Sequence, residues 1–262
     1  MITPGLVSVT FRQLEPDQII ELARQAGLQG IEWGGDIHVP HGNTSKGEEV
    51  RKQTLDSGLS VAAYGSYYKV GHSESAGLHF GSVLETAVAL GAPTIRVWAG
   101  TLGPDQADTQ YRRLVAEDAI RIASLAADAG VSISFEAHEG SLADGTEKAS
   151  LFFKEVNHPN IYGYWQPPHG ISVEACRAGL IAVLPRLSNL HVFHWWPTSH
   201  DRRPLWEGRD RWLTYLNTAQ ETKHNHYAML EFVTGDNPET FKEDALMLCS
   251  WINNLPSEPN CS

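Results

Sequence analysis

A unit made of an amphipathic helix, a glycine and a short apolar run recurs along the chain, and it constrains the fold more than any other feature. In the first copy, apolar residues at helical spacing over residues 19–26 end at Gly27 and precede an apolar run. The unit returns at Gly58, Gly91 and Gly130. Glycine suits the left-handed conformation that ends a helix because it has no Cβ to clash. A period of roughly 30 to 40 residues is typical of successive strand–helix units.

The apolar runs indicate about eight strands. They are expected at residues 6–9, 30–33, 60–64, 94–98, 131–136, 161–165, 190–193 and 227–232, with a last helix near residues 238–251. Strands that alternate with helices imply a parallel sheet with right-handed crossovers. The length of 262 residues is close to the roughly 250 residues of a (β/α)8 barrel. We therefore expect one barrel domain over residues 1–253, with a flexible tail over residues 254–262.

Other classes of protein fit the sequence less well. No G-x-G-x-x-G follows the first strand and no G-x-x-x-x-G-K-[ST] occurs, which disfavours an open nucleotide-binding sheet. The formal net charge of -11 disfavours nucleic acid as a partner, because an acidic surface repels phosphates. The three cysteines are too scattered to form a disulfide framework. We see no secretory signal and no apolar run of the roughly 20 residues that span a bilayer, so we expect a cytoplasmic protein without a membrane partner.

Polar residues stand at the ends of the later strands, where a (β/α)8 barrel builds its active site. The fifth strand ends at Glu136, the sixth runs into Gln166, the seventh holds His191 and the eighth ends at Glu231. Because these strands are consecutive, a closed barrel brings the four side chains to one rim. Carboxylate, imidazole and amide-oxygen ligands suit Mn²⁺, Mg²⁺, Co²⁺ or Zn²⁺, and the lack of thiolates disfavours a structural zinc site.

These residues also have ordinary structural explanations. A glutamate at a strand end is commonly solvated or ion-paired, and a lone histidine in an apolar strand is commonly a hydrogen-bonded core residue. A buried Arg96 could likewise pair with Glu32 or Glu136 as part of the barrel. The joint placement of the strand-end residues favours the metal site, because a buried carboxylate is costly unless it is paired or bound to a metal.

Further strand-end residues are candidates for substrate contact. They are His38, Arg96, Trp98, His138, His169 and His194. Aromatic rings at strand ends could stack on the C–H face of a sugar, or they could close the barrel mouth. The remaining histidines are expected at the surface: His72, His79, His158, His224 and His226.

The order of elements and the strand-end residues resemble the xylose-isomerase-like barrels, a sugar phosphate isomerase/epimerase group that includes ketose 3-epimerases, inosose dehydratase and endonuclease IV. The resemblance extends over essentially the whole chain and is clearest at residues 30–36 and 90–98, at the strand ending in Glu136 and at residues 190–192. That family typically holds one metal ion with Glu, Asp, His and Glu from the last four strands. The resemblance implies the ligands Glu136, Gln166, His191 and Glu231, and it matches His169 to a substrate-contacting histidine.

The chain departs from the family pattern at Gln166, where most relatives have aspartate. Glutamine offers an oxygen ligand but removes one negative charge, so two carboxylates just balance a divalent ion. This should weaken metal binding and leave the ion more electrophilic. His169 could also take the place of Gln166 as a ligand.

The resemblance implies a divalent-metal-dependent isomerase or epimerase that acts on a keto sugar, sugar phosphate or polyol through an enediolate, with Mn²⁺ as the first expectation for the ion. Glu136 and Glu231 would remove and return the proton. The first alternative is a lyase or dehydratase on a keto-sugar or keto-inositol, with His138 or His169 as the proton donor.

Two further alternatives remain. An endonuclease-IV-like hydrolase is disfavoured by the acidic charge and the small ligand set, and a non-catalytic sugar-binding barrel would have Gln166 as the mark of lost activity. The partner expected is a small carbohydrate. The long loop over residues 195–208 carries Arg202 and Arg203 and predicts a lid or a homodimer contact.

Overall fold

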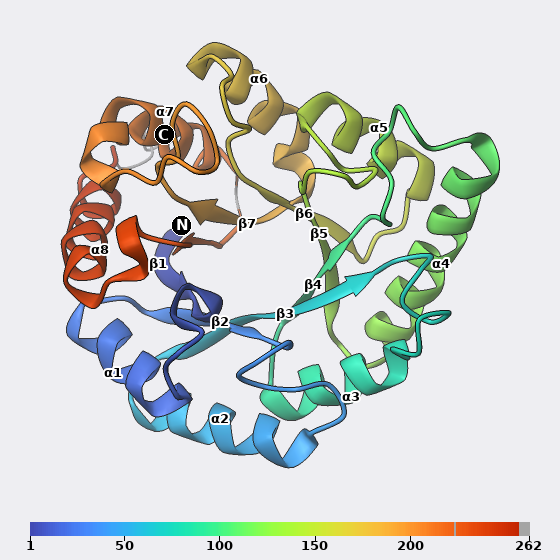
Figure 1. The fold of residues 1–262 in the computed structure, drawn as a ribbon, viewed down its shortest axis with the longest axis horizontal. Coiled ribbons are helices and arrows are strands. Elements are labelled where there is room, and N and C mark those ends of the chain that lie inside the picture. The colour runs from blue at the N-terminus through green and yellow to red at the C-terminus, as the bar shows by residue number, and fades with distance from the viewer. Residues whose placement is uncertain (223, 257–262) are drawn as a thin grey trace, which may run out of the picture.

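The computed structural model describes residues 1–222 and 224–256, and its parallel strands close into one barrel (Figure 1). The strands are β1 (Ile2–Val7), β2 (Gly30–Gly34), β3 (Ser60–Lys69), β4 (Thr94–Trp98), β5 (Ser132–Glu136), β6 (Ile161–Trp165), β7 (Leu187–Val192) and β8 (His226–Leu230). Each strand pairs with the next, and β8 pairs with β1 to close the sheet. The expected (β/α)8 barrel is confirmed. Of the tail expected at residues 254–262, residues 257–262 lie outside the described part of the chain.

Helices surround the barrel and cover the outer face of its strands (Figure 1). They are α1 (Pro16–Gln25), α2 (Thr44–Asp56), α3 (Phe80–Leu90), α4 (Thr109–Asp128), α5 (Thr146–Val156), α6 (Val173–Val183), α7 (Arg209–Ala219) and α8 (Pro238–Asn253). Short 3-10 turns lie at η1 (Ser8–Phe11), η2 (Leu184–Arg186), η3 (Leu205–Gly208) and η4 (Thr234–Asp236). Among the described residues, no helix has the length and apolar character needed to cross a membrane.

The glycines that mark the sequence repeat do follow helices. Gly27, Gly58, Gly91 and Gly130 have φ values of 75°, 80°, 72° and 73°. Residues with a Cβ are strained in this left-handed region, so glycine ends the helix at low cost and returns the chain to the next strand.

The strand boundaries differ most from the expected ones in β1 and β3. β1 ends at Val7, and the next four residues form η1. β3 continues to Lys69 instead of ending before Gly65, and its pairing with β4 shifts between Gly65 and Tyr68. Ser66 and Tyr67 have no partner in the β4 register and Tyr67 has φ of 55°, so two extra residues are accommodated without ending the strand. Glycine and serine weaken the strand pattern here, and the sequence alone therefore predicted the end of the strand too early.

The expectation that His226 lies at the surface is wrong. Its side chain is buried at the start of β8, where Nδ1 lies 2.7 Å from the carbonyl oxygen of Ser188. The ring closes the amino-terminal end of the barrel by bonding to the backbone of the neighbouring strand β7. A histidine with both ring nitrogens near hydrogen-bond partners can be buried at low cost.

The interior of the barrel is unusually polar. Barrels of this kind are generally filled by branched apolar side chains. Here Glu32 on β2, Arg96 on β4 and His191 on β7 are all buried and contact one another or a shared partner, although their strands are not neighbours in the sheet. Contacts between non-adjacent strands must cross the interior. Burying such charges is costly, so the arrangement calls for a functional explanation.

Candidate metal centre

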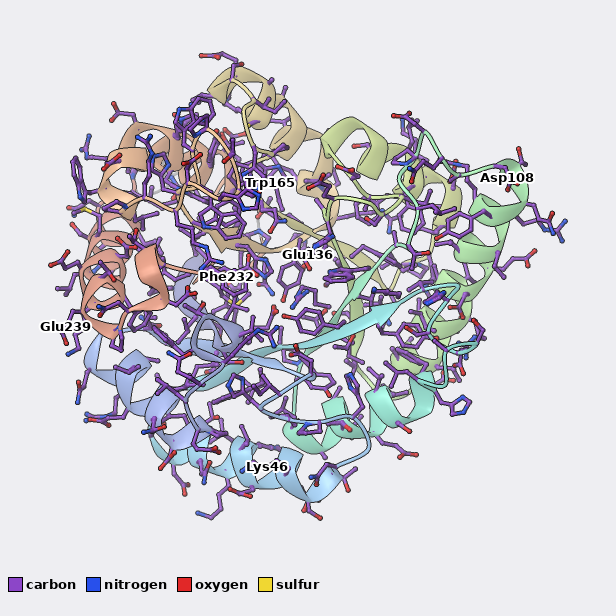
Figure 2. The ribbon with its side chains drawn as sticks, viewed as in Figure 1. Lys46, Asp108, Glu136, Trp165, Phe232 and Glu239 are labelled. Carbon is purple, nitrogen blue, oxygen red and sulfur yellow. The ribbon has the colours of Figure 1, made fainter. Side chains whose placement is uncertain are left out.

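Glu136, His191 and Glu231 converge at the carboxyl ends of β5, β7 and β8. One potential ligand atom from each lies within 4.8 Å of the others, and all three residues are buried. His191 Nδ1 is 3.3 Å from Glu231 Oε2 and 3.7 Å from Glu136 Oε1. Figure 2 shows Glu136 at the central opening of the barrel, whereas Lys46, Asp108 and Glu239 lie on the outer ring. The three side chains can therefore ligate one cation.

The backbone explains why these side chains face inward. Glu136 is the last residue of β5, and Glu231 follows β8 directly. The amide of Glu231 donates to the carbonyl oxygen of Val192 at 3.0 Å, which extends the pairing of β8 with β7 by one residue. Alternate residues of a strand point to one face, so the position of each residue in its strand decides that its side chain enters the barrel.

Gln166 brings an amide oxygen to this group as a candidate fourth ligand. It follows β6, and its Nε2 donates a hydrogen bond of 3.0 Å to the carbonyl oxygen of Ala137. The amide oxygen Oε1 then lies 3.2 Å from His191 Nδ1. His169, the other candidate for this role, stacks instead on Trp195 with 5.4 Å between ring centroids. The structure thus brings Gln166 to the group and places His169 above it.

Arg96 joins two of the buried carboxylates. Its Nε donates to Glu32 Oε1 at 2.6 Å, and its Nη1 donates to Glu136 Oε2. Nη2 of Arg96 has no hydrogen-bond partner among the described residues, so its two N–H groups are left for another group. Pairing within the barrel is therefore observed, and contact of Arg96 with a substrate stays a prediction.

The neighbouring charges keep the carboxylates of Glu32 and Glu136 ionised. Burial raises the pKa of Glu32, but the charge of Arg96 and the contact with His191 outweigh burial and lower its pKa to about 2. The pKa of Glu136 is also lowered, because Arg96 and His191 again outweigh burial. Burial lowers the pKa of His191, yet the charge of Glu231 and hydrogen bonding to Glu136 and Glu231 raise it well above its usual value. These buried carboxylates therefore attract positive charge strongly.

The charges in the barrel interior match a divalent cation. Three carboxylates (Glu32, Glu136 and Glu231) and one guanidinium (Arg96) sum to −3 + 1 = −2. A divalent cation beside a neutral His191 brings this sum to zero. Because a net charge in a buried setting is costly, the donor set and the charge both fit such an ion.

Two groups of aromatic rings in contact border the metal centre. The first group consists of Tyr67, Trp98 and His138, with centroids 5.4 Å and 4.1 Å apart along the series. The second group consists of His169, Trp195 and Phe232, with centroids 5.4 Å and 5.9 Å apart. Figure 2 shows Phe232 across the central opening from Glu136. Rings of this kind pack well against the C–H faces of sugars.

Tyr67 and Phe232 were not among the residues selected from the sequence. Their φ values of 55° and 49° are uncommon for non-glycine residues and mark backbone strain. Glu32 was considered only as a partner of Arg96. The signal that could have found it is its place in the middle of an apolar strand, where alternation points every second side chain inward.

The structure does not bring His38 and His194 to the metal centre. His38 Nδ1 bonds to Ser8 Oγ at 2.9 Å, and its ring packs edge-on against Trp33. His194 faces Gly208, where an added Cβ would lie 2.7 Å from Nδ1 of the ring. Burial lowers the pKa of both rings, which therefore favour the neutral form. Their assignment as substrate contacts stays a prediction.

The long loop over residues 195–208 is pinned beside the mouth. Arg202 pairs with Asp236 at 2.7 Å and lies over the ring of Phe232, and Arg203 pairs with Glu207 at 3.4 Å. A backbone bridge joins Trp195 to Arg202 within the loop. The charges of both arginines are thus already balanced by carboxylates of the chain.

Solved structures share this fold over almost the whole chain. The probable 3-DHS dehydratase AsbF of petrobactin synthesis from Bacillus anthracis has a TM-score of 0.75 at 17% identity, covering 94% of this chain and 98% of that one. The IOLI protein with a bound zinc atom has a TM-score of 0.74 at 15% identity, covering 97% and 99%. The D-allulose 3-epimerase from Methylomonas sp. has a TM-score of 0.69 at 14% identity, covering 95% and 97%. No curated protein sequence matches the chain.

Identities this low establish a shared fold alone. The sequence itself matches a family model described as the xylose isomerase-like TIM barrel, over residues 20–251. The matched range contains Glu32, Arg96 and all four residues that meet at the metal centre. The chain belongs to the xylose isomerase-like TIM barrel family.

Proposed function

We propose that this protein is a divalent-metal-dependent enzyme that isomerises or epimerises a keto sugar or polyol through an enediolate. The observation that carries the proposal is the convergence of Glu136, His191 and Glu231 with the amide oxygen of Gln166. A divalent cation held there supplies positive charge that stabilises the enediolate oxygens. Mn²⁺ is the ion that we propose, because it accepts a mixed set of carboxylate, amide and imidazole ligands.

Glu231 is the better placed of the two carboxylates to remove a proton from carbon. Oε2 of Glu136 already accepts hydrogen bonds from Arg96 and from Trp98 Nε1. Among the described residues, the only ion pair recorded for the carboxylate of Glu231 is the one with His191. A carboxylate that accepts fewer hydrogen bonds is the stronger base, so we assign proton removal to Glu231. Glu136 is ionised, so it would first take a proton from a substrate hydroxyl group and then return it to carbon, while Glu231 gives its own proton to the oxygen.

The mouth of the barrel favours an unphosphorylated substrate. The two ring groups offer apolar surfaces for the C–H face of a sugar or cyclic polyol. Arg202 and Arg203, the loop cations that could meet a phosphate, are already paired with Asp236 and Glu207. A phosphate would therefore compete with these carboxylates for the charge of the two guanidinium groups.

A lyase or dehydratase is the second candidate. It begins with the same proton removal, after which the substrate loses a hydroxyl group from the neighbouring carbon. This reading is favoured by the position of His138, whose ring stacks on Trp98 while its Nδ1 contacts the carbonyl oxygen of Glu139 at 2.7 Å. With Nδ1–H donating to that carbonyl oxygen, His138 would have to be an imidazolium cation for its Nε2 to protonate a departing hydroxyl. The fold shared with a probable dehydratase is consistent with it.

The test is metal-dependent exchange of a substrate hydrogen. The protein is stripped of metal, reloaded with Mn²⁺ and incubated in D₂O with a panel of ketoses and keto-inositols, and NMR follows deuterium uptake next to the carbonyl group. We expect Glu231→Gln to slow exchange by roughly 10²- to 10⁴-fold, the usual contribution of a general base. Glu239→Gln on the exposed start of α8 is the matched control. Exchange that needs no metal, or that continues unchanged in Glu231→Gln, would contradict the proposal, and loss of water from the substrate would favour the lyase.

A further inference from the structure

Glu32 is fully buried in the barrel interior and uses its two oxygens differently. Oε1 accepts the 2.6 Å hydrogen bond from Arg96. Oε2 has no hydrogen-bond partner among the described residues, and it lies 3.6 Å from His191 Nε2. Pairing with Arg96 alone would satisfy only half of this carboxylate. Its second oxygen faces the histidine of the metal centre.

The two ring nitrogens of His191 likewise face different groups. Nδ1 faces the ligand oxygens of Gln166 and Glu231, at 3.2 Å and 3.3 Å. Nε2 is buried without a hydrogen-bond partner among the described residues, and it faces Glu32. A neutral imidazole that ligates through Nδ1 carries its proton on Nε2. That proton then points at Glu32 Oε2, an acceptor for which no hydrogen bond is recorded among the described residues.

Glu32 reaches a second ligand through Arg96. The guanidinium donates to Glu32 through Nε and to Glu136 Oε2 through Nη1. Gly65 on β3 leaves the room for this pair, since a Cβ there would lie 2.7 Å from Arg96 Nη2 and 2.8 Å from Glu32 Oε1. One buried carboxylate thus contacts two ligand residues, His191 directly and Glu136 through a single guanidinium.

We propose that Glu32 is a positioning residue of the metal centre: it fixes the proton of His191 on Nε2, so that Nδ1 faces the ion, and it holds Arg96 against Glu136. This inference rests on the proposed function, because it presupposes the cation. Partners of this kind orient ligating histidines, and their loss commonly weakens metal binding by roughly 10- to 100-fold. Glu32 does not contact the ion itself.

The experiment compares Mn²⁺ affinity by calorimetry in the wild-type protein, Glu32→Gln and the control Thr94→Val. Thr94 is also buried in the barrel, where its hydroxyl bonds to Ser134, and it has no recorded contact with the ligand residues. Glutamine can still accept from Arg96, but its NH₂ group opposes a proton on His191 Nε2. We expect Glu32→Gln to bind Mn²⁺ about 10- to 100-fold more weakly, and Thr94→Val to bind it as the wild type does.

A second readout follows the proton on His191. In the Zn²⁺-loaded wild type, ¹⁵N NMR should show Nε2 protonated and Nδ1 bound to metal, and this pattern should be lost in Glu32→Gln. If Glu32→Gln does not fold, Glu32→Asp takes its place, since it keeps the charge beside Arg96 but withdraws the carboxylate from His191. Wild-type affinity in the folded variant, or Nε2 unprotonated in the wild type, overturns the inference alone. A wild-type protein that binds no divalent metal overturns the proposed function as well.

Discussion

Trp98 Nε1 donates a hydrogen bond of 2.6 Å to Glu136 Oε2, the same oxygen that accepts from Arg96. Two donors on one oxygen fix the carboxylate, and they leave Oε1 directed toward His191 Nδ1 at 3.7 Å. Glu136 can therefore offer one oxygen to a cation while the other is held by the barrel. The same indole stacks on His138, so one side chain links the metal centre to the first group of rings.

Replacing Trp98 with phenylalanine keeps an aromatic ring beside His138 and removes the indole donor. We expect turnover to fall by about 10-fold, because a hydrogen bond to a charged group is worth about 1.5–3 kcal/mol and part of it is regained from water. Steady-state kinetics on the substrate found in the exchange assay would measure the change. Trp206→Phe, on an exposed part of the long loop, is the control. Equal turnover in the two variants would show that the indole does not support Glu136.

The sequence predicted the barrel and the meeting of its strand-end side chains for a clear physical reason. Strand–helix alternation fixes a parallel sheet, and a parallel barrel places the ends of consecutive strands on one rim. Glu136, His191 and Glu231 follow from these rules. They do not give the orientation of individual side chains, so the contact of His38 with Ser8 and that of His194 with Gly208 could not be predicted.

Gln166 offers a direct test of the charge balance. Gln166→Asp adds one negative charge at the position of the amide oxygen that faces His191. We expect Mn²⁺ to bind about 10-fold more tightly, because a carboxylate attracts the cation more strongly than an amide does, and we expect turnover to fall as the ion becomes less electrophilic. Gln166→Ala should bind Mn²⁺ more weakly than wild type. Calorimetric titration of the three proteins measures these affinities. We expect Mn²⁺ to bind most tightly to Gln166→Asp, then to the wild type and most weakly to Gln166→Ala. Any other order would exclude Gln166 as a ligand.

Gly65 should resist replacement. In Gly65→Ala the added Cβ meets Arg96 Nη2 and Glu32 Oε1, and both belong to a buried ion pair with little freedom to move. We expect the free energy of unfolding to fall by about 1–3 kcal/mol, as for other overpacked interiors. Urea denaturation measures it. Gly81→Ala is the matched control, because no atom lies within 4 Å of the new Cβ and alanine favours its helix. A loss no larger than that of the control would contradict the described packing.

Asp244 should make stability depend on pH. Its carboxylate on α8 accepts a 2.8 Å hydrogen bond from the amide of Leu205, and burial raises its pKa from 3.8 to about 6. A raised pKa means that the folded protein binds this proton more tightly than the unfolded chain does. The resulting stabilisation is therefore complete below about pH 4 and lost as the pH rises through about 6.

The comparison of wild type with Asp244→Asn isolates this effect, since asparagine does not titrate. Relative to the variant, the wild type should lose at most about 2 kcal/mol between pH 4 and pH 7. Urea denaturation across this range gives the difference. Asp210→Asn, at an exposed position on α7, serves as the control. Parallel stability curves for wild type and Asp244→Asn would show that the carboxylate titrates normally.

Several features of the centre depend on the register between strands, which the sequence does not display. The bulge at Tyr67 turns a ring toward Arg96, 4.9 Å from its guanidinium carbon. Which nitrogen of His191 faces Glu32 follows from a rotation of the ring. Glu32 and Arg96 each stand on an apolar strand with the periodicity of an inward position, yet their contact joins strands separated by β3.

The account depends on one divalent cation held at the mouth of the barrel. The most direct measurement is the structure of crystals grown with Mn²⁺, with anomalous diffraction at the manganese edge to locate the ion. We expect one strong peak per chain, with Glu136, Gln166, His191 Nδ1 and Glu231 as its protein ligands. A map with no peak among these residues, or with the ion held elsewhere, would contradict the account.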